Sequence, residues 1–89
     1  MLNKDRIRKE LDNVGLTCSV KIIAYCKGSP YAELRFLYMP LTFSFLEKVS
    51  QVLGTKNINI ESEIEYGYYD SVKSDLVLEV RDIDPQFED

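Results

Sequence analysis

The stretch 57–68, NINIESEIEYGY, decides the fold because apolar and polar residues alternate along it. Its apolar members are Ile58, Ile60, Ile64, Tyr66 and Tyr68. Only Ser62 interrupts the apolar set. A period of two is typical of a β-strand with one buried and one solvated face. The stretch therefore predicts a strand that covers a hydrophobic core.

The same period occurs in residues 16–27, 31–39 and 75–81. In the second of these, the apolar side of the alternation comprises Ala32, Leu34, Phe36 and Tyr38. A Lys-Gly-Ser-Pro turn at 27–30 joins the first two stretches into a hairpin. A polar turn at 70–74 precedes the last strand. Four strands are therefore expected.

Two segments repeat apolar residues at helical spacing, which predicts amphipathic helices. Residues 3–14 form the first and end before Gly15, where a glycine suits the position after a helix. The second ends at Gly54, and either Thr42 or Ser44 can serve as its N-cap.

These elements occur in the order α-β-β-α-β-β. Four strands with one apolar face each can bury that face under two amphipathic helices. We therefore predict an α+β two-layer sandwich, with a four-stranded, mainly antiparallel sheet and both helices on one face. Residues 1–82 form the single domain in this prediction, and residues 83–89 form an acidic C-terminal tail. The strand order stays open.

Composition narrows the range of functions. The chain has 89 residues, 45% of them hydrophobic, a net charge of −4 and no histidine. It therefore lacks the usual general base and nitrogen metal ligand, and we expect no catalytic residue, metal or cofactor. The longest uncharged stretch, 36–46, is too short to cross a bilayer. The N-terminus is charged where a secretory signal is apolar, so a cytoplasmic protein without membrane contact is expected.

The two cysteines, Cys18 and Cys26, lie eight residues apart in one predicted strand. At ~3.3 Å per residue their Cα atoms would be about 26 Å apart, far beyond disulfide range. We expect reduced thiols that pack as small apolar side chains.

Three glutamates, Glu61, Glu63 and Glu65, alternate along the decisive stretch and are expected on its outer face. Neighbours in such a row lie about 6.6 Å apart. The row can mimic a phosphate backbone or bind a hard cation, although no ligand spacing of a known metal loop accompanies it. It can also be an ordinary solvated face, balanced by basic residues on neighbouring strands.

Other predicted contact residues are Ile23, Tyr25, Arg35, Leu37 and Tyr69. Apolar and aromatic side chains rimmed by charge are common on binding surfaces. Charge is also divided along the chain. Residues 1–44 hold seven basic and four acidic residues, whereas residues 45–89 hold four and eleven. Such a division favours a charged partner or head-to-tail self-association.

The sequence thus predicts a small acidic, non-enzymatic protein-binding module, an inhibitor or adaptor that binds a larger basic protein and can act as a nucleic-acid mimic. In size and charge it is similar to phage inhibitors, antitoxins and immunity proteins. The alternative is a self-assembling subunit that dimerises through its open sheet face or a strand edge. Direct nucleic-acid binding is disfavoured because the basic cluster on the first helix is small. An enzyme that uses carboxylates or a thiol is the third hypothesis.

Overall fold

The computed structural model describes residues 1–24, 28–68 and 71–89, and within residues 62–74 only the backbone. Its elements are α1 (Lys4–Asn13), β1 (Ser19–Ile23), β2 (Tyr31–Met39), α2 (Phe43–Leu53), β3 (Ile58–Tyr68), β4 (Ser71–Val80) and the short 3-10 helix η1 (Pro85–Phe87). The predicted order α-β-β-α-β-β is confirmed.

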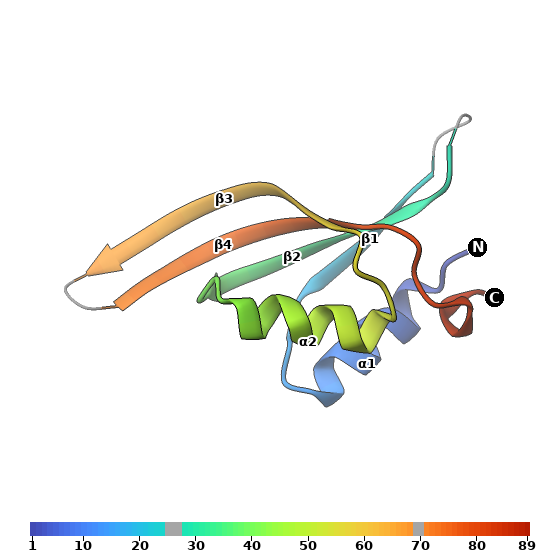
Figure 1. Cartoon of the computed structure of the whole chain (residues 1–89), viewed down its shortest axis with the longest axis horizontal. Helices are drawn as coiled ribbons and strands as arrows, with labels where there is room; N and C mark the ends of the chain where they lie inside the picture. The colour runs from blue at the N-terminus through green and yellow to red at the C-terminus, as the bar shows by residue number, and fades with distance from the viewer. Residues whose placement is uncertain (25–27, 69–70) are drawn as a thin grey trace.

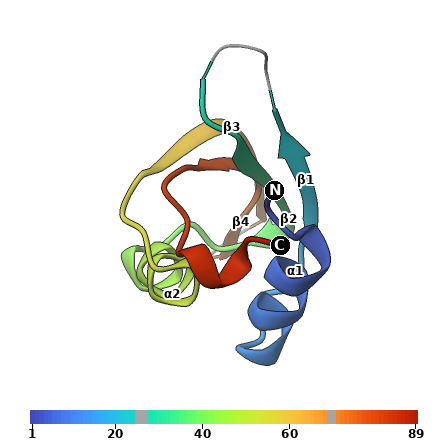
Figure 2. The same cartoon turned by 90° about the vertical axis from the view of Figure 1, so that its right-hand side faces the viewer.

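The sheet has four strands in the order β1-β2-β4-β3, and all neighbouring strands are antiparallel. Both helices lie on one face, which makes the predicted two-layer sandwich (Figure 1). Figure 2 shows α1 on the β1 side of the helical layer and α2 on the β3 side. Because β4 lies between β2 and β3, the two edges of the sheet are β1 and β3.

The core lies between the two layers and follows the periodicities predicted for β2, β4 and the two helices. The sheet contributes Ala32, Leu34, Phe36, Leu76, Leu78 and Val80, all fully buried. The helices contribute Ile7, Leu11, Phe45, Val49 and Leu53. The rings of Phe36 and Phe45 meet edge to face with their centroids 4.9 Å apart, a favoured aromatic geometry that ties α2 to the centre of the sheet.

Side-chain caps fix where the helices begin. The side-chain oxygen of Asn3 accepts a hydrogen bond from the Arg6 N–H, and that of Thr42 accepts one from the Phe45 N–H, both at 3.1 Å. Thr42, not Ser44, is therefore the N-cap of α2. These bonds satisfy amide groups that a helix leaves without a partner in its first turn.

The strands differ in length from the expectation. β1 covers only Ser19–Ile23 of the predicted 16–27, of which residues 25–27 lie outside the described part of the chain. β4 already begins at Ser71, inside the predicted polar turn, because it pairs with β3 as far as Tyr68. Cross-strand pairing thus outweighs the low strand propensity of a polar segment. β3 and β4 consequently extend past the N-terminal end of α2 (Figure 1).

Two register shifts interrupt the period of two. In β2 the shift falls between Phe36 and Met39. There Tyr38 adopts a φ of 55°, donates its N–H to the Asp75 carboxylate at 2.9 Å and exposes 61% of its surface. Tyr38 therefore departs from the predicted apolar face, as expected where a bulge inserts one residue. In β3 the shift falls between Ile60 and Ser62.

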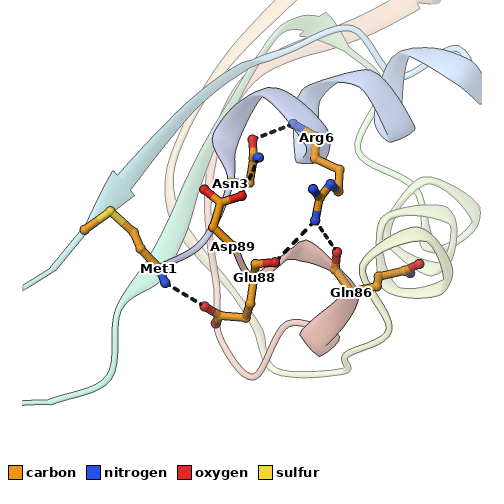
Figure 3. Close-up of polar contacts among 6 residues, drawn as sticks. All are labelled: Met1, Asn3, Arg6, Gln86, Glu88 and Asp89. Atoms are coloured by element: carbon orange, nitrogen blue, oxygen red, sulfur yellow. Dashed lines mark hydrogen bonds and ion pairs between the residues drawn. The ribbon is translucent and has the colours of Figure 1, made fainter.

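The C-terminal segment differs from the predicted acidic tail. Ile83 and Phe87 are buried in the core, and Leu2 forms a β-bridge with Glu88. The side chain of Arg6 donates to the carbonyl groups of Gln86 and Glu88 (Figure 3). Residues 83–89 thus pack against the N-terminus as part of the domain. The acidic composition of this segment did not indicate that two of its apolar side chains, those of Ile83 and Phe87, reach the core.

No helix among the described residues is both long and apolar enough to span a membrane.

Candidate functional site

The predicted contact residues do not form one compact group. Glu61 is exposed on β3, and Glu63 and Glu65 follow it on the same edge strand. Ile23 is half-buried at the end of the opposite edge strand. Arg35 and Leu37 lie exposed on β2, Leu37 with 60% of its surface accessible. The two predicted tyrosines, Tyr25 and Tyr69, lie outside the described residues.

The register shift in β3 changes the expected row of glutamates. Before the shift Ile60 pairs with Leu78, and after it Glu63 pairs with Leu76. Leu76 and Leu78 are both fully buried on the helix-covered face. Ile60 and Glu63 therefore take equivalent register positions although they are three residues apart, because Glu61 is the extra residue of the bulge. Glu63, opposite Leu76, and Glu65, opposite Ser74, therefore take register positions of the helix-covered face, and the prediction that both lie on the outer face is wrong.

The open face of the sheet is balanced in charge where its side chains are described. Lys21 on β1 lies opposite Glu33 on β2, and Glu33 lies opposite a second carboxylate, that of Glu79 on β4. The Arg81 guanidinium lies 3.7 Å from the Glu79 carboxylate and 4.1 Å from the centre of the Tyr31 ring. It thereby covers Tyr31, which is only 6% exposed. This face therefore presents interspersed basic and acidic residues rather than an acidic array.

The free edge of β3 directs backbone groups away from the sheet. The carbonyl of Asn57 accepts the Arg81 N–H at 2.9 Å, so these residues form a hydrogen-bonded pair. In an antiparallel ladder such pairs alternate with pairs whose backbone groups point to the other side. Ile58 and Ile60 hold the alternate positions. The Ile58 N–H bonds locally to the Lys56 carbonyl, which leaves the Ile58 carbonyl and both backbone groups of Ile60 directed at the free edge.

A groove of about 550 Å³ lies beside this edge, between α2 and the start of β3. It is lined by Phe43, Leu46, Glu47, Ser50, Lys56, Ile58, Asn59 and Ile60. Phe43 is 82% exposed and Ile60 is 45% exposed, which is unusual for large apolar side chains that lie together. We refer to this feature as the α2–β3 groove.

Sequence reasoning did not find the α2–β3 groove. Phe43 begins α2 but falls outside the apolar stripe that contains Phe45, Val49 and Leu53. The signal in the sequence that could have indicated this groove is an aromatic residue outside the core stripe. Alternation predicts Ile60 on the core face, and only the position of α2 relative to the edge strand leaves it partly uncovered.

One free thiol, that of Cys18, lies in the described part of the chain. The pKa of the Cys18 thiol is raised to about 11, mainly by burial and also by the Asp12 carboxylate, with the Arg8 guanidinium opposing. The thiol is therefore protonated at neutral pH, whereas the nucleophile would be the thiolate. Within the described part of the chain, no group of three acidic, cysteine or histidine residues is placed to hold a metal. Cys26 lies outside that part.

Comparisons with protein-family models, curated proteins and solved structures found no match to this chain. The proposal for its function therefore rests on the geometry and charge of the chain itself.

Proposed function

We propose that this chain is a non-enzymatic protein-binding module, an inhibitor or adaptor, which binds a larger basic protein in the cytoplasm through its acidic edge and neighbouring apolar side chains. One observation carries the proposal: β3 is a free edge strand that contains three glutamates and no lysine or arginine. Protein-binding modules commonly use such an edge with a charge pattern that selects the partner.

Charge on β3 favours a basic partner over a second copy paired along the same strand. Two copies joined through β3 would bring six glutamates together without a basic residue from either strand. Like charges on neighbouring strands destabilise pairing, and charged edge residues prevent edge-to-edge association. A lysine- or arginine-rich surface would reverse the sign of this interaction. If that surface is a nucleic-acid-binding groove, the chain would act as a nucleic-acid mimic and compete with the nucleic acid.

The test is affinity capture from a lysate of the source organism with the wild-type chain and a Glu61→Lys/Glu63→Lys variant, followed by mass spectrometry. We expect the variant to lose a basic protein that the wild type retains, and the affinity for that protein to fall as salt rises. Glu10→Lys/Asp12→Lys is the matched control, because it changes the net charge equally on exposed positions of α1. Identical captures by all three chains would contradict the proposal.

Self-association is the second candidate, and the uncovered face of the sheet favours it. Among the described residues no helix packs on that face, where Leu37 is 60% exposed. An isologous dimer would cover such a face. Sedimentation equilibrium at high micromolar concentration separates the candidates. A dimer that reverts to a monomer on Leu37→Arg substitution would establish self-association, and a strict monomer would exclude it.

A further inference from the structure

We infer that the partner contributes an extended basic segment, which adds to the sheet along Ile58–Ile60 of β3 and places one apolar side chain in the α2–β3 groove. This inference rests on the proposed function and specifies the partner element that is recognised. It combines three features at one place in the fold: free backbone groups, an apolar groove and an acidic strand.

The backbone supplies the first step. The Ile58 carbonyl and the N–H and carbonyl groups of Ile60 point away from β4, toward the free edge. An added strand can therefore form main-chain hydrogen bonds without displacing any bond of the sheet. Main-chain bonds provide affinity in strand addition, while pockets for alternate side chains provide specificity.

The groove supplies that pocket. A strand next to β3 would lie about 4.8 Å away and place every second side chain on the helix-covered face. On this face, next to Ile58 and Ile60, the α2–β3 groove is open and Phe43 is 82% exposed. Its volume of about 550 Å³ lies within the usual range of ligand-binding pockets. An apolar side chain of the partner would cover the surface of Phe43 and Ile60 that the described part of this chain leaves exposed.

Charge determines the chemistry of the occupant. The exposed Glu61 follows directly after Ile60, and Glu63 and Glu65 continue the strand. Lysine or arginine residues beside the apolar anchor of an added strand would compensate these carboxylates. The bulge at Glu61 limits regular pairing to the section before it, because bulges twist an edge out of register. The recognised segment is therefore short, with basic residues flanking an apolar anchor.

The probe is a fluorescein-labelled nine-residue peptide of alternating lysine and leucine, and fluorescence anisotropy measures its binding to the intact chain. We expect Phe43→Ser to weaken binding about tenfold or more, because a buried aromatic contact is lost. The exposure of Phe43 makes this change compatible with folding, which circular dichroism verifies. Val14→Ser is the matched control, since Val14 is an exposed apolar residue at the far end of α1.

Two further peptides separate strand addition from general adhesion. A peptide with glutamate in place of lysine should not bind. A peptide N-methylated on the side that faces β3 should bind about tenfold more weakly, because it loses main-chain donors. Nuclear magnetic resonance of the labelled protein should place the largest amide shift caused by the unmodified peptide at Ile60.

Several outcomes would overturn the inference: unchanged binding by Phe43→Ser, equal binding of the glutamate peptide, or no effect of N-methylation. A dimer lost on Ile60→Lys substitution would assign the edge to a second copy instead. The captured partner distinguishes this inference from the proposed function. If capture needs Glu61 and Glu63 but not Phe43, the groove is not the contact while the proposed function stands. If capture does not depend on Glu61 and Glu63, the proposed function itself fails.

Discussion

Gly54 lies where the end of α2 contacts the C-terminal segment. It takes a left-handed φ of 67°, and a Cβ atom there would lie 2.9 Å from the Cβ of Asp84. The Asp84 N–H donates to the Leu53 carbonyl at 2.9 Å, which fixes this approach. Both the backbone angle and the lack of a side chain are therefore required.

We predict that Gly54→Ala lowers the free energy of unfolding by more than the ~1 kcal/mol that left-handed strain alone costs. Gly15→Ala is the control, because Gly15 has a similar φ of 79° but no atom within 4 Å of an added Cβ. Urea denaturation of the two variants measures the difference. An equal loss in both would show that the contact with Asp84 does not matter.

Cys18 gives a second prediction at this scale. Its folded pKa of about 11 exceeds the ordinary value of 9.0, mainly because of burial. The native state therefore holds a proton that the unfolded chain releases, so stability falls as pH rises from about 9 to about 11. A Cys18→Ala variant should lose less stability over this range than the wild type in paired urea titrations. Parallel curves for both chains would disprove this role of Cys18.

At the scale of elements, α1 and the C-terminal segment stabilise each other. The Arg6 guanidinium donates to the Gln86 carbonyl at 2.7 Å and to the Glu88 carbonyl at 3.3 Å. Around it, the Asn3 amide donates to the Asp89 carboxylate, and the N-terminal ammonium lies 3.1 Å from that of Glu88 (Figure 3). These contacts hold the N-terminal residues against the C-terminal segment. They lie next to η1, whose Phe87 is buried in the core.

We predict that Arg6→Ala lowers the free energy of unfolding by about 1 kcal/mol through loss of these hydrogen bonds. Arg8→Ala should change it by less than about 0.5 kcal/mol, because Arg8 makes an exposed ion pair with Asp5 within the same helix. Thermal and urea unfolding of both variants provide the comparison. If Arg8→Ala costs as much as Arg6→Ala, the contact between the chain ends contributes nothing.

At the scale of the whole molecule, the strand order concentrates stability in the centre of the sheet. β2 and β4 pair on both sides, whereas β1 and β3 each pair on one. The side chains of Leu34 and Leu78, which face each other across β2 and β4, are fully buried. Regions with paired backbone and buried side chains open last.

Native-state hydrogen exchange should therefore be slowest at the amides of Leu34 and Leu78. Lys21, whose N–H faces β2 on the edge strand β1, should exchange faster, because it is exposed and its strand has five residues. Mass spectrometry or nuclear magnetic resonance can follow these positions. Equal protection of Lys21 and Leu34 would contradict the assignment of β1 as a weaker part of the sheet.

The sequence by itself determined the element types and the two-layer architecture. Periods of two and of 3.6 residues act locally, and so do the caps at Asn3 and Gly54. These patterns indicate which face each element buries, and therefore that both helices cover one side of the sheet. The absence of histidine likewise restricted the expected chemistry without reference to the fold.

Only the tertiary structure decided the strand order, the bulges and the α2–β3 groove. The order β1-β2-β4-β3 depends on where α2 returns the chain, which no local pattern encodes. The bulge at Glu61 shifts the register of β3 against β4, so Glu63 and Glu65 take positions on the face opposite to the one that alternation predicts. Phe43 and Ile60 remain exposed because α2 does not cover the sheet beyond its β3 edge. Long-range pairing, which acts between residues far apart in the chain, determines these features.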